Sequence, residues 1–331
     1  MAERRVILKI QGDLKTYFFT FDGVAKAVDG VNFEIAEGET FGLVGETGCG
    51  KSVTALSVLR LVDPPGRTVS GEILFEGEDL LRVKEKEMQQ VRGNKIGMIF
   101  QDPISSLNPV MTAGFQLKES IRLHKGVREK KAECLAIEMM EQVRIPDPSK
   151  VMKRYPHELS GGMQQRIMIG IALCCHPKLI IADEPTTALD VTIQAQILRL
   201  IRDLKHDFGS SMLMITHNLG LVSKYCDRVG VMYAGSLVEV CEVSDVFSEP
   251  LHPYTKGLIE AIPKVNVERE TLPVIQGRIP DIIHPPGGCK FHPRCKEVGP
   301  RCSEEKPPLV EIKPGHWVAC VHVGLHGRVL R

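Results

Sequence analysis

The chain has 331 residues, of which 43% are hydrophobic and 25% are charged, a composition typical of folded proteins rather than disordered ones. Its 42 Lys and Arg residues are balanced by 41 Asp and Glu residues, which excludes a bulk positive charge that would attract nucleic acid or an anionic membrane. The length exceeds the about 250–300 residues at which a single core stops growing, so we expect a large domain and a smaller one.

The sequence contains no run of about 18 apolar residues, the length that a membrane-spanning helix requires. The best candidate, 167–182, is interrupted by His176, Pro177 and Lys178. Residues 1–15 also lack the apolar stretch of a secretory signal. We therefore expect the chain to stay in the cytosol, where its ten cysteines would remain reduced.

The first part of the chain predicts an antiparallel β region. Apolar and polar residues alternate over 6–35, and turns are expected at residues 22–23 and 29–30. One aromatic ring of the group 17–19 could stack on an adenine, and Phe18 is the candidate. Packing of the Phe18 ring against the sheet is an equally open interpretation.

A short apolar run, 40–44, leads into a Gly-x-x-x-x-Gly-Lys-Ser loop and then into the helix-forming segment 53–59. This order of strand, glycine loop and helix is typical of a phosphate-binding P-loop. Glycines permit the backbone conformations in which successive N–H groups face phosphate oxygens. Lys51 would reach the β- and γ-phosphates, and Ser52 would bind Mg²⁺. The predicted nucleotide-binding residues are Gly45, Glu46, Thr47, Gly48, Cys49, Gly50, Lys51, Ser52 and Val53.

The middle of the chain predicts strands at 69–77 and 96–100, the second ending at Gln101, and helices at 112–124 and 127–143. The sequence Leu-Ser-Gly-Gly at 159–162 opens another helix, which we expect to run to about residue 175. A hydroxyl group and the N–H groups of a helix start can bind an anion, which makes candidates of Ser160, Gly161 and Gly162. An ordinary helix cap is the other interpretation of this tetrapeptide.

The apolar strand 179–182 ends in the acidic pair Asp183-Glu184. Burying such a pair is costly unless a cation compensates it, and a Mg²⁺ beside the P-loop would do so. Asp183 is the candidate on the metal side, and Glu184 is the candidate that orients or deprotonates the attacking water. After a helix at 192–208, the strand 212–216 ends at His217. Ligands of such sheets bind beyond the carboxyl ends of the strands, where four candidates fall: Gly45, Gln101, Asp183 and His217.

Together these motifs resemble those of the ATP-binding-cassette (ABC) ATPases over residues 1 to about 245. In the order of that family they correspond to the Walker A loop, Q-loop, signature, Walker B strand, D-loop and switch histidine: 45–52, Gln101, 159–166, 179–184, 188–190 and His217. The resemblance implies an α/β fold, namely an ABC-type P-loop ATPase with a RecA-like core, an antiparallel β edge and an α-helical subdomain at about 102–170. It also implies that Glu184, His217 and Gln101 are catalytic and that Ser52, Gln101 and Asp183 bind Mg²⁺.

Further motifs resemble the ATPase subunits of bacterial and archaeal dipeptide/oligopeptide importers, which also include nickel importers; they lie at 100–103, 106–109, 233–235 and 252–255 and in the cysteine-rich tail. The resemblance implies a peripheral ATPase on the cytoplasmic face of the inner membrane. Its partners would be two transmembrane permeases, an extracytoplasmic peptide-binding protein that acts through them, and a second ABC ATPase subunit, usually a non-identical paralogue.

Two alternatives to peptide import stay open. One is an importer ATPase for nickel or another small solute, because cargo specificity would lie in other subunits. The other is a soluble ABC ATPase that acts on nucleic acid or ribosomes. Proteins of that class typically carry long coiled-coil insertions or two fused cassettes, and this chain has neither.

The last segment, 246–331, is rich in Pro, His and Cys, and we interpret it as a small Cys-rich C-terminal module beside an ATPase domain at 1–245. We expect a helix at about 254–261 and little regular structure after it. Such a Pro- and Gly-rich segment cannot easily bury a core, so a bound metal is a reasonable source of its order.

Four cysteines of this tail are candidate metal ligands: Cys289, Cys295, Cys302 and Cys320. Their spacing leaves open an iron–sulfur cluster, zinc, or unligated thiols and disulfides. Basic neighbours could offset the charge of the thiolates; these are Lys290, Arg294, Lys296 and Arg301. The tail resembles that of dipeptide-importer ATPases, in which these positions bind a [4Fe–4S] cluster, and this favours the cluster, with Zn²⁺ as the alternative.

Overall fold

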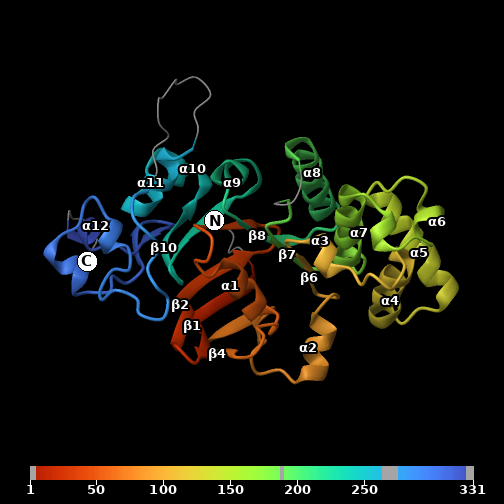
Figure 1. The fold of residues 1–331 in the computed structure, drawn as a ribbon, viewed down its shortest axis with the longest axis horizontal. Helices are drawn as coiled ribbons and strands as arrows, with labels where there is room; N and C mark the ends of the chain where they lie inside the picture. Colours follow the sequence, from red (N-terminus) through yellow and green to blue (C-terminus); the bar gives the residue numbers. More distant parts are fainter. Residues whose placement is uncertain (1–4, 187–189, 263–274, 326–331) are drawn as a thin grey trace. The chain divides into compact units, whose positions relative to one another are not determined.

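The computed structural model describes residues 5–186, 190–262 and 275–325. The chain divides into two compact units, which can be followed by colour in Figure 1. The P-loop unit contains residues 8–35, 39–81 and 215–331, and the helical unit contains residues 1–7, 36–38 and 82–214.

An antiparallel sheet forms the first part of the P-loop unit. Its strands are ordered β2-β1-β4-β5, with the bounds Gly23–Ala36, Val6–Thr20, Gly66–Phe75 and Glu78–Asp79. The predicted antiparallel region is thereby confirmed. The predicted turn at residues 29–30 is wrong, because β2 is one continuous strand and Gly30 takes a positive φ of 88° inside it. Glycine adopts that angle without strain, so it interrupts the sequence pattern but not the strand.

A second group of strands in the P-loop unit has the order β11-β12-β10-β9-β3. Their bounds are Val310–Lys313, His316–Val318, Ser236–Glu242, Arg228–Tyr233 and Thr40–Val44. Strands β3 and β9 are parallel, and the others pair antiparallel. The described tail residues 275–309 contain neither α-helix nor strand, in line with the expectation, but β12 pairs with β10 and alternates buried, exposed and buried residues.

The helices of the P-loop unit are short: α1 (Lys51–Val58), α9 (Leu219–Tyr225), α10 (Val243–Ser248), α11 (Pro253–Glu260) and α12 (Val321–Leu325), with 3₁₀ turns at His292–Arg294 and Pro300–Ser303. Helix α11 confirms the helix predicted at 254–261. Its Tyr254 packs with Tyr233 of β9 and with Phe291 of the tail, at ring-centroid distances of 4.7 Å and 5.3 Å. The tail thus shares a hydrophobic core with the strands, contrary to the expectation that it could not easily bury one.

The helical unit contains three strands that are buried throughout, β6 (Ile96–Ile99), β7 (Leu179–Asp183) and β8 (Ser211–Thr216), the last of which continues into the P-loop unit. Their order is β8-β7-β6, and β6 pairs parallel with β7. Strands buried on both faces read as continuous apolar runs, which is why the sequence predicted each of them.

The helices of this unit are α2 (Glu85–Val91), α3 (Pro103–Ser106), α4 (Ala113–Lys125), α5 (Glu129–Gln142), α6 (Pro148–Val151), α7 (Gly161–Leu173) and α8 (Val191–Asp207), with a 3₁₀ turn at Pro156–Glu158. Helices α4, α5 and α7 pack together (Figure 1). Met139 and Met140 of α5 are buried, as expected of a core stripe. The Thr112 hydroxyl caps α4 at its start, and Gly126 ends it with a φ of 62°.

Candidate functional site

The glycine loop between β3 and α1 has the backbone that its sequence predicts. Gly45, Gly48 and Gly50 take φ angles of 153°, 81° and 105°. A Cβ atom on Gly45 would lie 2.1 Å from the carbonyl oxygen of Met232, and one on Gly50 would lie 2.2 Å from that of Ala27. Only glycine fits at these two positions, because the neighbouring backbone leaves no room for a side chain.

The tip of this loop is open to solvent. Thr47 and Gly48 are exposed, and nothing lies within 4 Å of the Cβ position of Gly48. Helix α1 starts at Lys51, so the positive end of its dipole lies at the loop. The Lys51 ammonium is buried in the loop, where it donates to the carbonyl oxygens of Gly45 and Glu46 at 2.9 Å and 3.1 Å.

Two residues that the sequence did not assign to this loop contact Glu46. The Tyr254 hydroxyl accepts a hydrogen bond from the Glu46 N–H at 2.9 Å, and Arg294 binds the Glu46 carboxylate through two nitrogens. Arg294 and Lys290, named above as residues that could offset the charge of the tail thiolates, thus each form an ion pair with a carboxylate. Lys290 forms its ion pair with Asp29 at 3.0 Å.

The acidic strand end lies in the helical unit. Asp183 ends β7 and is 6% exposed, so its carboxylate is nearly removed from water. Glu184 follows with a φ of 43°, a left-handed conformation that is uncommon outside glycine and typical of functional sites. The Gln101 side-chain amide, just after β6, donates to Glu184 Oε2 at 3.3 Å. The structure thus brings together two of the three predicted catalytic residues.

The signature segment begins helix α7 of the same unit. Ser160 is the N-cap residue, and its hydroxyl accepts from the Met163 N–H at 3.4 Å. Ser160 and Gly161 are exposed, and no atom lies within 4 Å of the Cβ position of Gly161. The helix start is therefore both capped and open to an approaching anion, so the two interpretations of the sequence are compatible.

His217 follows β8 and is exposed, so it is not the buried structural histidine that its sequence position also allowed. Asn218 caps the next helix by accepting from the Gly220 N–H at 2.9 Å. Of the predicted D-loop, Asp190 precedes α8, whereas Ala188 and Leu189 lie outside the described residues.

The aromatic group near the N-terminus lies on β1. Phe18 is half-buried against Gly66 of β4, where a Cβ atom would lie 2.6 Å from its ring. The Tyr17 hydroxyl donates to Asp29 at 2.8 Å, and the Arg67 guanidinium lies 4.3 Å from the centre of the Phe19 ring. Phe18 thus makes the sheet contact, and its stacking on adenine stays a prediction.

The four tail cysteines lie in the P-loop unit. All ten cysteines of the chain fall within the described residues, and none forms a disulfide. Burial, together with the other three thiols, raises the pKa of Cys289 to about 11. The Cys289 N–H donates to the Cys302 carbonyl at 2.8 Å, and Cys302 Sγ lies 3.4 Å from His322 Nε2. These contacts place the thiols within electrostatic range of one another.

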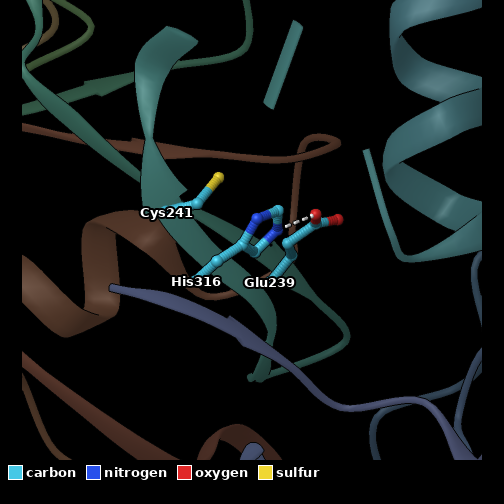
Figure 2. Close-up of side chains that lie close together, drawn as sticks. All are labelled: Glu239, Cys241 and His316. Carbon is cyan, nitrogen blue, oxygen red and sulfur yellow. Dashed lines mark hydrogen bonds and ion pairs between the residues drawn. The ribbon is translucent and has the colours of Figure 1, made fainter. Parts of the chain in front are cut away.

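A separate group of buried polar side chains joins β10 to β12. Figure 2 shows the His316 imidazole next to the Glu239 carboxylate and Cys241. His316 Nε2 donates to Glu239 Oε1 at 2.7 Å, and the backbone N–H groups of Leu251 and His252 donate to the same carboxylate at 2.8 Å and 3.0 Å. Burial alone would raise the pKa of Glu239, but these hydrogen bonds outweigh it and lower the pKa. The carboxylate is thus satisfied by hydrogen bonds within the protein.

Comparison with known proteins identifies the family. The model of the ABC transporter family matches residues 28–187, and that of the oligopeptide/dipeptide transporter C-terminal region matches residues 238–302. A probable peptide ABC transporter ATP-binding protein of Sinorhizobium fredii is 52% identical over 310 residues, which cover 93% of this chain and 92% of that protein. The chain belongs to the peptide ABC transporter ATP-binding proteins.

Other members of the family have similar coverage. The oligopeptide transport ATP-binding protein AppD of Bacillus subtilis is 50% identical, with 93% of this chain and 94% of that protein covered. The oligopeptide transport ATP-binding protein OppD of Escherichia coli is 47% identical, with 93% of this chain and 91% of that protein covered. A solved dimeric ATP-binding cassette, bound to ADP and phosphate, aligns with a TM-score of 0.64 and 25% identity over 71% of this chain and 98% of that chain.

As a peptide ABC transporter ATP-binding protein, the chain is an ABC ATPase, an enzyme that binds and hydrolyses ATP. The first matched region contains the glycine loop, Gln101, Ser160 and the Asp183-Glu184 pair. The second contains Tyr254, Arg294 and three of the four tail cysteines, and it ends before Cys320. A search of the described helices found none with the length and apolarity needed to cross a bilayer.

Proposed function

We propose that this chain hydrolyses ATP to drive the import of dipeptides or oligopeptides through a membrane transporter. The observation that carries the proposal is the extent of the likeness. It runs through both the ATPase part and the C-terminal region, and relatives at about half identity are named for oligopeptide transport. A likeness confined to the ATPase part would support ATP hydrolysis but not peptide transport.

The residues of the site have separate roles in this proposal. Lys51 and the N–H groups of the glycine loop bind the phosphates, because both supply hydrogen-bond donors at the loop. Glu184 orients the attacking water, and Gln101 holds its carboxylate in place. Mg²⁺, when bound, neutralises charge on the phosphates, and its predicted ligands stay Ser52, Gln101 and Asp183.

A second ABC ATPase subunit completes the site. The capped start of α7 presents an exposed hydroxyl and open glycines, which suit the γ-phosphate of a nucleotide bound by another subunit. We infer from the family that this subunit is a non-identical paralogue and that His217 contacts the γ-phosphate from the chain's own side.

The permeases would bind the helical unit. Four large apolar side chains are exposed on the segment that includes α3 and α4, with exposed fractions of 71%, 77%, 46% and 68% for Ile104, Val110, Phe115 and Leu123. Exposed apolar side chains of this size are typical of protein interaction sites. We propose that permease loops cover them and hold the chain at the cytoplasmic face of the inner membrane, with the peptide-binding protein on the other side.

Deletion of the gene for this chain should abolish uptake of a labelled dipeptide or tripeptide by the source cells. The wild-type gene should restore uptake, whereas Lys51→Ala should not, because the loop loses the ammonium that binds the phosphates. The measurement is the initial rate of uptake, with expression of both forms checked by immunoblot. Normal peptide uptake by the deletion strain, together with loss of nickel uptake, would establish the alternative cargo.

We further propose that Cys289, Cys295, Cys302 and Cys320 bind a [4Fe–4S] cluster, with Zn²⁺ as the alternative. The other three thiols act on Cys289 and help to raise its pKa, as expected where four thiols share one binding site. Four such ligands suit a cluster of several irons, each bound by one thiolate.

Protein purified without oxygen should be brown and contain about four irons per chain, because each thiolate binds one iron. Cys302→Ser should lose most of this iron, since its Sγ is buried among the other ligands. Cys134→Ser is the matched control, because Cys134 is exposed in the helical unit, and its iron content should not change. A colourless protein with one zinc per chain would show that Zn²⁺ is the occupant.

A further inference from the structure

Arg294 of the C-terminal tail holds a residue of the P-loop. It ends the 3₁₀ turn His292–Arg294, and its side chain is only 4% exposed. Nη1 donates to Glu46 Oε2 at 2.7 Å, and Nη2 donates to Glu46 Oε1 at 3.0 Å. Nε donates to the carbonyl oxygen of Gln276 at 3.0 Å. The guanidinium is therefore fixed by the tail on one side and binds Glu46 with two parallel hydrogen bonds on the other.

Glu46 in turn connects this contact to the phosphate-binding lysine. Its carbonyl oxygen accepts from Lys51 Nζ at 3.1 Å, and its N–H donates to the Tyr254 hydroxyl at 2.9 Å. Tyr254 is fully buried in the core that the tail shares with β9. The side chain and the backbone of Glu46 are thus both held by residues more than 200 positions away in the sequence.

The charge of Glu46 matters because its loop binds an anion. The carboxylate is 26% exposed, so water screens it only partly. An unpaired carboxylate next to the glycine loop would repel the phosphates of ATP. Arg294 neutralises it, and the hydrogen bonds with Glu46 raise the pKa of Arg294 further above its ordinary value. An arginine guanidinium is charged throughout the physiological pH range.

We propose that Arg294 is a positioning residue of the P-loop: it neutralises Glu46 and holds the loop in its phosphate-binding form, so that the C-terminal tail sets the affinity for nucleotide. The inference rests on the proposed function in one respect, because it takes ATP as the ligand. Arg294 also directly precedes Cys295, one of the proposed cluster ligands, so a metal bound there would order the turn that presents the guanidinium.

Arg294→Gln should weaken ATP binding by about 10-fold or more, because a charge-assisted, two-point contact is lost and Glu46 is left unpaired. Turnover at saturating ATP should change by less than about twofold, since the water-orienting residues are untouched. The measurements are the Kd for ATP by calorimetry and the KM and kcat of hydrolysis in the complex with the partner ATPase and the permeases. The ATP affinity of Arg294→Lys should lie between those of the wild type and Arg294→Gln, because Lys keeps the charge but cannot bind both carboxylate oxygens.

Adding Glu46→Gln to Arg294→Gln should recover most of the affinity, because no unpaired carboxylate remains. Arg301→Gln is the matched control. Arg301 directly precedes another proposed ligand, Cys302, but it is exposed and pairs with Glu305 at 2.8 Å, so ATP affinity should not change. Circular dichroism of each variant would verify folding, and if Arg294→Gln does not fold, Arg294→Lys and the double variant decide the question.

Wild-type ATP affinity in Arg294→Gln, or in Arg294→Lys where only that variant folds, would overturn the inference. An equal loss of ATP affinity in Arg301→Gln would also overturn the inference, because any change in the tail would then weaken ATP binding. These outcomes differ from failure of the proposed function, in which the wild-type protein itself would not bind or hydrolyse ATP.

Discussion

Glu184→Gln is expected to bind ATP with nearly wild-type affinity and to hydrolyse it about 10²–10⁴-fold more slowly, the range for loss of a general base. The amide retains the size of the side chain and can still contact Gln101, which now lies 3.3 Å from Glu184 Oε2. It cannot accept a proton from the attacking water, so the chemical step slows while the glycine loop is unchanged. The measurements are ATP turnover by phosphate release and ATP affinity by fluorescence.

Asp203→Asn provides the control for loss of one acidic group in the same unit. Asp203 is half-buried on α8 and pairs with Arg144 at 3.2 Å, so its replacement should not change turnover. Wild-type turnover by Glu184→Gln would mean that another group orients the water and would remove Glu184 from the catalytic residues.

His316→Ala should destabilise the P-loop unit by about 1–3 kcal/mol or more, because the buried Glu239 carboxylate loses one of its hydrogen-bond donors. Both His316 and Glu239 are 0% exposed, and no water can replace the lost hydrogen bond at that depth. The Glu239 carboxylate would keep its backbone donors, the N–H groups of Leu251 and His252. The measurement is the midpoint of thermal unfolding at neutral pH.

Lys313→Ala is the control for this variant. Lys313 ends β11 of the same hairpin and pairs with Glu249 at 3.0 Å, but it is 38% exposed, so its loss should cost about 0–1 kcal/mol.

The pH dependence of stability gives a second check on the role of Glu239. Because the folded pKa of Glu239 is lowered, its contribution is present above the ordinary carboxyl value of about 4.3 and is lost as the pH falls through the folded pKa. The wild type and His316→Ala should therefore converge in acid, and a constant difference would contradict this account.

The strands and the loop that carry the candidate site residues could be predicted from the sequence, because their conformation depends on residues that are close together in the chain. β3, β7 and β8 are buried along their whole length, so each appears in the sequence as an uninterrupted apolar run. The glycine loop was predictable for a different reason: backbone carbonyl groups approach Gly45 and Gly50 so closely that no side chain fits there. Asp183 and Glu184 follow directly from the strand that carries them.

The contacts of the tail were not predictable, because they depend on partners far away in the chain. Arg294 and Glu46 are 248 positions apart, and neither has a local pattern that identifies the other. His316 and Glu239 are residue types that usually lie at the surface, so each alone suggests exposure, and only the fold shows that they are buried together. β12 has three residues, too few for an alternating pattern to stand out.

The pairing of β12 with β10 also protects the protein from association through its backbone. Without the tail, the seven residues of β10, five of them buried in the intact chain, would offer unpaired N–H and carbonyl groups to any extended segment nearby. Unpaired apolar strands of this kind are templates for intermolecular β-pairing. In the intact chain the outermost strand is instead β11, which has four residues, two of them the charged Glu311 and Lys313. The last residues of the tail thus contribute to solubility, and a chain cut before β11 would lose this protection.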